Sequence, residues 1–326
     1  MRVCRVQRVK TTFFSPDSQD SPDSLDSFMV SGNNSKPAGE VREEKTESRR
    51  RSPWPLALIA GLFVVAAFLT WYGTWFGRTL SYEDMGRYLK EENKPRHVQH
   101  ALFQIAERIN NHDEGVKKFY PQVASLAASP TTEIRQAAAW VMGQDNSSEE
   151  FHAALLKLLD DSEPVVRRNA AVQLVRFNDA RGLAELRAIL KPYEVQAKAQ
   201  GRVDNALPDG TNVTFGTLLA RIETPDKRIE ELRSPLPGVI RRVVAGEDKE
   251  IRQGETLFSI APDGEFVWEA LRALYVVGQP EDLKEVERYA QGVEHMPVRI
   301  KEQAAMTAKA IRDRSRDSSG SGSSAQ

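Results

Sequence analysis

From Ser81 to Lys191, apolar residues recur three and four positions apart, as at Val123, Leu126 and Ala127. This spacing is typical of amphipathic helices, whose apolar faces must be covered. Polar segments rich in Pro, Asn, Asp and Ser interrupt the pattern at 129–132, 143–148 and 160–164. Because each helix is short and one-sided, we expect neighbouring helices to stack and complete a shared core.

A motif repeats within this pattern, in which a branched or apolar residue precedes an alanine by four positions. Its four copies are Ile134 with Ala138, Val166 with Ala170, Phe266 with Ala270, and Ile300 with Ala304. The first two copies lie 32 residues apart and the last two 34, whereas 100 residues separate the second from the third. A segment without this motif, roughly residues 193–263, is therefore inserted into the helical repeat.

The inserted segment is itself duplicated at an offset of 38, which pairs Val213 with Ile251, Gly216 with Gly254, Leu219 with Leu257, and Ile222 with Ile260. Short runs of Val, Leu and Ile between Gly-containing turns predict β-strands. The expected turn glycines are Gly210, Gly216, Gly238 and Gly254. Two such halves, paired about a pseudo-twofold axis, predict one small flattened all-β barrel.

The helical repeats resemble the HEAT family, including the HEAT-like repeats of phycobilisome lyases, over residues 95–190 and 264–312. The resemblance rests on two sequences that each follow a turn of Asp, Ser and Pro: Ile134-Arg135-x-x-Ala138 and Val166-Arg167-x-x-Ala170. It implies an α-solenoid that holds partners. Arg135 and Arg167 are expected to form a ladder along the solenoid or, like Trp140 and Trp268, to serve in ordinary packing between repeats.

The inserted segment resembles the biotinyl/lipoyl fold and its relative in membrane-fusion (periplasmic adaptor) proteins, and this implies a barrel-sandwich hybrid. The first half matches the family pattern at Gly210, Val213, Gly216 and Leu219, and the second half matches it over 234–240. Asp248 stands where the second turn of the family has glycine, so Gly246 is the alternative turn residue.

The hairpin between the two halves contains a candidate attachment lysine. Lipoyl carriers modify a lysine at this tip, and here the tip sequence is Glu223-Thr-Pro-Asp-Lys227. The resemblance therefore implies lipoate attachment at Lys227. The alternative is a solvated lysine in a Pro-Asp turn, which is favoured by the extra Pro225 and by Arg228 in place of a small residue.

An apolar segment of 23 residues without charge, Trp54 to Phe76, predicts a transmembrane helix. Aromatic residues stand at both of its edges, as they do at membrane interfaces. A signal peptide or a buried helix is the alternative. The cluster Arg49–Arg51 predicts a cytoplasmic N-terminus, and so an inner-membrane, single-pass protein whose C-terminal part is periplasmic or otherwise extracytoplasmic.

Composition sets the remaining boundaries. The ends, 1–52 and 313–326, are rich in Ser, Asp, Gly and charge, and we expect them to be disordered. Between them the expected order is a transmembrane helix over 53–77, HEAT-like repeats over 81–192, the β insert over 193–263, and further HEAT-like repeats over 264–312. Met29 is an alternative start to Met1.

Few residues indicate chemistry. The one cysteine, Cys4, excludes a disulfide framework, and a net charge of −1 gives no reason to expect nucleic acid. His97 and His100 share a helix face, but no third ligand stands at a supporting spacing, so we expect no metal. We also find no pair of nucleophile and base, and expect neither an enzyme nor a cofactor.

The function predicted from these patterns is a membrane-anchored, non-enzymatic scaffold or adaptor that binds protein partners of a bacterial envelope complex. The rival is a lipoyl- or biotinyl-type carrier that serves a membrane-associated enzyme through Lys227. A third candidate is a binder of small ligands or glycans on the concave face of the solenoid.

Overall fold

The computed structural model describes residues 54–75, 79–243 and 249–321. The chain divides into two compact units, residues 1–67 and 68–326. The predicted disordered arm over 1–52 lies outside the described residues, as does the turn around Gly246 and Asp248.

Helix α1 (Trp54–Trp75) forms within the segment predicted to cross a membrane. Over the described part of the chain, however, no helix combines the length and the apolar character that a membrane crossing requires. This finding contradicts the predicted transmembrane helix and the inner-membrane localisation inferred from it. The orienting residues Arg49–Arg51 lie outside the described residues.

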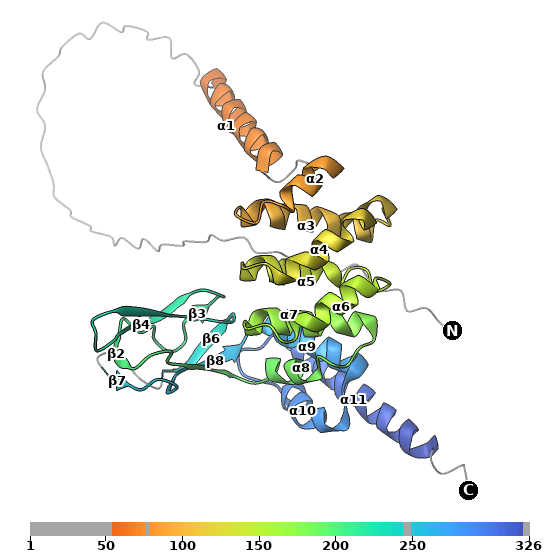
Figure 1. The fold of residues 1–326 in the computed structure, drawn as a ribbon, viewed down its shortest axis with the longest axis vertical. Coiled ribbons are helices and arrows are strands. Elements are labelled where there is room, and N and C mark those ends of the chain that lie inside the picture. The colour runs from red at the N-terminus through yellow and green to blue at the C-terminus, as the bar shows by residue number, and fades with distance from the viewer. Residues whose placement is uncertain (1–53, 76–78, 244–248, 322–326) are drawn as a thin grey trace, which may run out of the picture. The chain divides into compact units, whose positions relative to one another are not determined.

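The second unit begins with helices stacked in two layers (Figure 1). One layer contains α3 (Pro95–Asn110), α5 (Thr132–Met142), α7 (Pro164–Leu174), α9 (Gly264–Val277) and α11 (Val298–Ser321). The other contains α4 (Tyr120–Ser125), α6 (Glu149–Leu158), α8 (Leu183–Ile189) and α10 (Leu283–Gln291). Helix α2 (Tyr82–Tyr88) packs on α3, and α11 continues past residue 312, where the disordered tail was expected to begin. The mainly helical character expected of the chain is thus observed.

Local sequence explains where these helices begin. Pro164 occupies the first turn of α7, where its missing N–H costs nothing. Before α6, the Ser148 hydroxyl accepts a hydrogen bond from the backbone N–H of Phe151, and before α9 the Asp263 carboxylate accepts one from Glu265. Such caps satisfy backbone donors that have no partner within the helix.

The repeated motif forms the contacts between neighbouring helices. Seven of its positions are at most 1% exposed, and only Phe266 is half-buried; the seven are Ile134, Ala138, Val166, Ala170, Ala270, Ile300 and Ala304. Polar contacts also join neighbouring helices: Asn169 donates to the Gln136 carbonyl (3.0 Å) and Thr307 to the Leu271 carbonyl (2.8 Å). The alanines leave room for this close approach of the helix backbones.

The solenoid is continuous in space across the insertion. Leu190, three residues before the inserted segment, accepts hydrogen bonds at its carbonyl from Arg288 (2.7 Å) and Tyr289 (2.9 Å) of α10. Arg187 of α8 pairs with the buried Asp282. Residues before and after the insertion therefore share one hydrophobic core.

The inserted segment folds as two four-stranded antiparallel sheets. One has the order β1 (Tyr193–Gln196), β8 (Thr256–Pro262), β6 (Gly238–Val243) and β3 (Asn212–Val213). The other has the order β5 (Ile229–Arg233), β4 (Leu218–Glu223), β2 (Gly201–Asp204) and β7 (Glu250–Ile251). The all-β prediction is met, but the expected closed barrel is wrong. Each sheet ends on a strand of only two residues, β3 or β7, and no ladder continues into the other sheet over the described strands.

The two halves of the inserted segment make matching hydrogen bonds and matching close contacts at pseudo-twofold-related positions. The Gly216 N–H donates to the Ser234 carbonyl, and the Gly254 N–H donates to the Ala197 carbonyl, both at 2.8 Å. A Cβ on Gly201 would collide with the Glu223 carbonyl, and one on Gly238 would collide with the equivalent carbonyl of Ala261. We call this two-sheet unit, residues 193–262, the β module.

The β module packs against the solenoid at one of its ends. Leu236, in the loop between β5 and β6, is 2% exposed and belongs to the first solenoid core, and Tyr193 and Phe215 pack against that core. The guanidinium of Arg168 on α7 lies 5.6 Å from the Tyr193 ring and donates to the Ala188 carbonyl (3.2 Å). These contacts fasten the β module to α7 and its neighbours.

Candidate functional site

The two repeat arginines meet at one turn. Arg135 binds both carboxylate oxygens of Asp161 (Nε–Oδ2 2.6 Å, Nη2–Oδ1 2.9 Å), while Arg167 donates to the Asp161 carbonyl (2.8 Å) and pairs with Glu185 (2.8 Å). Burial alone would raise the pKa of Asp161. The hydrogen bonds from Arg135 and from the Glu163 N–H, together with the charges of Arg135 and Arg167, outweigh it and hold that pKa below its ordinary value. Both side chains thus link successive repeats, which is a structural use.

Two aromatic groups lie on the layer formed by α3, α5, α7, α9 and α11. Phe103 is half exposed, and its ring stacks on Trp140 with centroids 6.3 Å apart and planes 7° apart. Trp268 lies between two guanidiniums, with Arg272 at 4.6 Å and Arg299 at 5.4 Å from its ring centroid. Aromatic faces attract cations through the ring quadrupole.

A charged cluster connects these two aromatic groups. Arg176 donates to the Gln144 carboxamide (3.4 Å), and Arg272 lies 3.6 Å from the Glu269 carboxylate. Burial raises the pKa of Glu269, against the opposing charges of Arg272 and Arg176, and burial lowers the pKa of Arg176. Arg272 thus pairs with the half-buried Glu269, and the charge of the exposed Arg176 also acts on that carboxylate.

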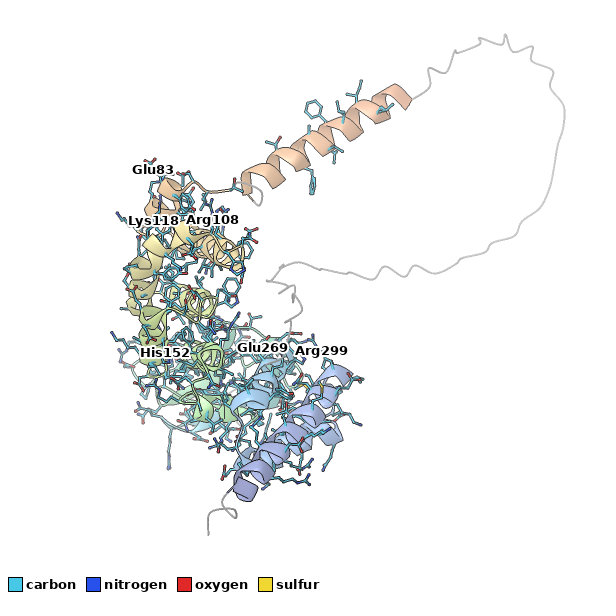
Figure 2. The ribbon with its side chains drawn as sticks, turned by 90° about the vertical axis from the view of Figure 1, so that its right-hand side faces the viewer. Glu83, Arg108, Lys118, His152, Glu269 and Arg299 are labelled. Carbon is cyan, nitrogen blue, oxygen red and sulfur yellow. The ribbon has the colours of Figure 1, made fainter. Side chains whose placement is uncertain are left out.

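We call this set the aromatic–arginine face; it comprises Phe103, Trp140, Gln144, Arg176, Trp268, Glu269, Arg272 and Arg299. In Figure 2, Glu269 and Arg299 lie on one side of the helix stack, and Lys118 and His152 of the other layer lie on the opposite side. Contacts link Phe103, Trp140, Gln144 and Arg176 on one side of the set, and Glu269, Arg272, Trp268 and Arg299 on the other. Among these residues, sequence reasoning singled out only Trp140 and Trp268.

Lys227 stands at the tip of the hairpin between β4 and β5. Its backbone has φ 63°, its side chain is 80% exposed, and its Nζ lies 2.8 Å from a carboxylate oxygen of Glu223. The turn is held by hydrogen bonds from the Lys227 N–H to the Thr224 carbonyl and from the Thr224 N–H to the Arg228 carbonyl, both at 2.9 Å. A lysine so placed is accessible to an enzyme that modifies it.

The histidines have partners within the solenoid. His97 contacts Glu91 (2.6 Å) and stacks on Tyr88, while His100 contacts the Gln104 carboxamide (3.0 Å). Over the described residues, no group of three or more metal-ligating side chains converges. The pair His97 and His100 is therefore explained by local packing.

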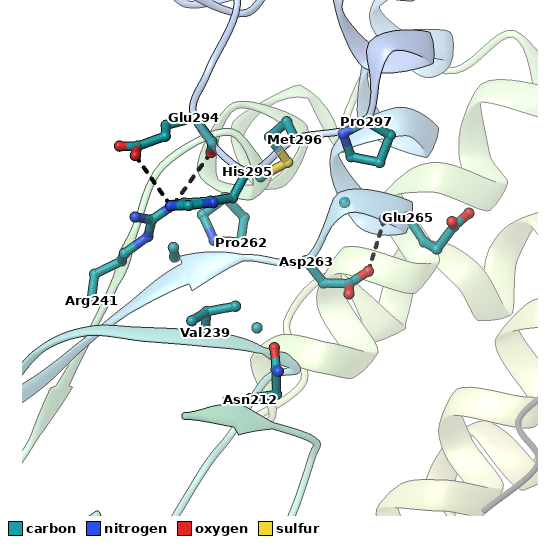
Figure 3. A pocket seen from close by; sticks show the side chains of 13 residues that line it. Asn212, Val239, Arg241, Pro262, Asp263, Glu265, Glu294, His295, Met296 and Pro297 are labelled. Atoms are coloured by element: carbon teal, nitrogen blue, oxygen red, sulfur yellow. Dashed lines mark hydrogen bonds and ion pairs between the residues drawn. The ribbon is translucent and has the colours of Figure 1, made fainter. Parts of the chain in front are cut away.

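A cleft of about 280 Å³ lies where the β module meets the α10–α11 loop and the start of α9 (Figure 3). Several of the polar groups that line the cleft form hydrogen bonds or ion pairs with neighbouring protein groups. Arg241 donates to the Glu294 carbonyl (3.4 Å), His295 lies 3.2 Å from the Glu294 carboxylate, and Asp263 caps α9. We regard the cleft as part of the joint between the two regions.

Comparison with known proteins gives one family. A profile described as HEAT repeats matches residues 121–200, so the chain contains HEAT repeats. No curated protein matches the chain. One solved structure, titled "Structure and function of a single-chain, multi-domain long-chain acyl-coa carboxylase", is similar at 19% identity over 38% of this chain and 14% of that chain, with a TM-score of 0.21. The match spans about one-seventh of that protein, and at this TM-score it carries no argument.

Proposed function

We propose that this protein is a non-enzymatic scaffold that binds protein partners through its HEAT solenoid and its β module. The observation that carries the proposal is a continuous two-layer solenoid, matched by HEAT repeats over 121–200, with large side chains left exposed on one layer. Stacked repeats create extended surfaces that serve in protein interaction.

We further propose that the β module is of the biotinyl/lipoyl type, in an open two-sheet form. Support comes from its eight strands in two antiparallel sheets and from its pseudo-twofold hydrogen bonds at Gly216 and Gly254. The hairpin at Lys227 is the pseudo-twofold counterpart of the junction from β8 to α9, where the chain returns to the solenoid. In such a fold the two lie at opposite ends, so the hairpin is presented away from the helices.

That placement favours a second candidate, a carrier in which Lys227 is the attachment point. The alternative is an ordinary solvated turn. It is favoured by the ion pair between Lys227 and Glu223 and by the extra Pro225. Intact-mass measurement of the protein isolated from its native cells separates the two. A mass equal to that of the bare chain eliminates the carrier, and an added group that is lost in Lys227→Arg supports it.

Site-specific photo-cross-linking tests the scaffold proposal. A photoreactive residue in place of Phe103 samples the exposed layer, and one in place of the exposed Lys157 on α6 is the matched control. We expect protein adducts at position 103 in intact native cells, and fewer at 157. If both positions trap only a second copy of this chain or nothing, the scaffold proposal is wrong.

A further inference from the structure

The aromatic–arginine face has a surplus of positive charge at its centre. Arg272 is paired with Glu269 and Arg299 with Glu265, whereas the guanidinium of Arg176 donates to the neutral Gln144 carboxamide. The central group of three residues therefore carries one uncompensated positive charge. A further carboxylate is the group that would neutralise it, and charged groups in partly dehydrated surroundings interact more strongly than in bulk water.

Apolar contact area flanks this charge on two sides. Phe103 and Trp140 lie toward α3 and α5, and Trp268 lies toward α11. Half of the Phe103 side chain is exposed although it stacks on Trp140. Large rigid aromatic groups of this kind supply much of the binding energy at protein interfaces.

Neighbouring helices that present these groups run parallel to one another, since successive contacts keep the same order along both partners. Gln136 meets Asn169 and Gln144 meets Arg176, while Glu265 meets Arg299 and Tyr275 meets Arg314. Packed helices lie about 9 Å apart, and an extended chain advances about 3.3 Å per residue. An extended peptide crossing the layer thus uses about three residues per helix. The midpoint of the Phe103–Trp140 pair lies between α3 and α5, and the midpoint of the two arginines lies between α7 and α9. About two helix spacings separate these midpoints, which corresponds to about six residues.

From these observations we propose that the aromatic–arginine face binds an extended segment of a protein partner, in which a carboxylate side chain stands about six residues from a large apolar or aromatic side chain. The inference rests on the proposed scaffold function and specifies the partner's chemistry. The carboxylate lies between Arg176 and Arg272, and the apolar side chain packs on Phe103 and Trp140.

Peptide display on the full-length protein tests the inference directly. A library of random 12-residue peptides is selected on the wild-type chain, and affinities of the enriched peptides are measured by fluorescence polarisation. We expect Asp or Glu together with Phe, Trp or Leu at the stated separation. We then replace the Asp or Glu of a peptide by Asn or Gln. This change is expected to lower the affinity of the peptide for the wild-type chain about tenfold, and to have little effect on its affinity for the double variant Arg176→Gln, Arg272→Gln.

Three further variants sharpen the test. Glu269→Gln removes the competing carboxylate and is expected to tighten binding of the acidic peptides about threefold. Phe103→Ser weakens binding, and Lys157→Gln, a charge removal on α6, leaves it unchanged. All of these side chains are at least partly exposed, and thermal melts of each variant establish that the chain remains folded.

The outcomes separate this inference from the function on which it rests. The inference is wrong if no peptides are enriched or if the enriched peptides contain no acidic residue. It is also wrong if replacing the acid by its amide lowers the affinity equally on the wild-type chain and on the double variant. Cross-linked partners found at position 103 would still support the scaffold in those cases. If cross-linking also yields no partner, both the scaffold and this face are wrong.

Discussion

The solenoid and the β module are both built by repetition, but their repeats are joined differently. In the solenoid each helix contacts its near neighbours, and polar contacts such as those of Asn169 with Gln136 and of Thr307 with Leu271 join one repeat to the next. In the β module the two halves interleave, so that each sheet takes two strands from each half. A local fault in the solenoid therefore affects neighbouring repeats, whereas a fault in either half of the β module affects both sheets.

The largest effect is expected from Gly238→Val. Its side chain would collide with the Ala261 backbone in the pairing of β6 with β8, and we expect a loss of about 3 kcal/mol in the free energy of unfolding of the β module. Hydrogen exchange should then show lost protection in both sheets and retained protection in α5 and α7. Gly264→Ala, whose Cβ would make only ordinary contacts of 3.4 Å or more, is the matched control. Loss confined to the second half would refute the interleaving.

Arg135→Met is expected to destabilise the solenoid at the turn that contains Asp161. It leaves the Asp161 carboxylate, whose side chain is 7% exposed, without its bidentate partner, and a buried charge deprived of its partner costs about 3 kcal/mol. Denaturant unfolding measures this loss, and hydrogen exchange should locate it in α5 to α7. Arg87→Met, which removes an exposed pair with Asp84, should change stability by less than about 1 kcal/mol. Equal effects of the two variants would contradict a linking role for Arg135.

Leu236→Ala tests the joint between the two regions. Leu236 is 2% exposed within the solenoid core, so its truncation should cost about 2 kcal/mol. Proteolysis should become faster in the connections at residues 191–193 and 262–264 and not within the strands. Ile229→Ala, at a side chain 54% exposed on β5, is expected to change stability by less than about 0.5 kcal/mol. Unchanged proteolysis would show that Leu236 does not hold the module in place.

The smallest effect is a pH dependence confined to the solenoid turn. The folded pKa of Asp161 is lowered, so its contribution is present above the unfolded pKa, near 4, and is lost as pH falls through the folded value. The melting temperature of the wild-type chain should therefore drop more steeply between about pH 5 and 3 than that of Asp161→Asn. Parallel profiles for the two chains would contradict this assignment.

Much of the fold could be predicted because its signals are local. The polar segments at 129–132, 143–148 and 160–164 coincide with helix ends, and Gly216 and Gly254 lie with positive φ just before β4 and β8. Gly238, which was also expected in a turn, instead begins β6 in extended backbone. The candidate site could not be predicted in the same way. Phe103, Arg176, Glu269 and Arg299 are far apart in sequence and share no motif, and only stacking of α3, α5, α7, α9 and α11 makes them neighbours. Trp140 and Trp268 were visible as candidates but were indistinguishable from packing residues.

The sequence by itself determined the helices, the strands, the interruption of the repeat and the duplication within it, because helical and strand periods and glycine turns depend on residues close in the chain. The tertiary structure alone decided that the strands form two open sheets, that Leu236 enters the solenoid core, and that Arg176, which follows α7, comes close to Glu269 and Arg272 of α9. These features depend on how many strands pair and on which surfaces meet, and no local pattern encodes such contacts between distant residues.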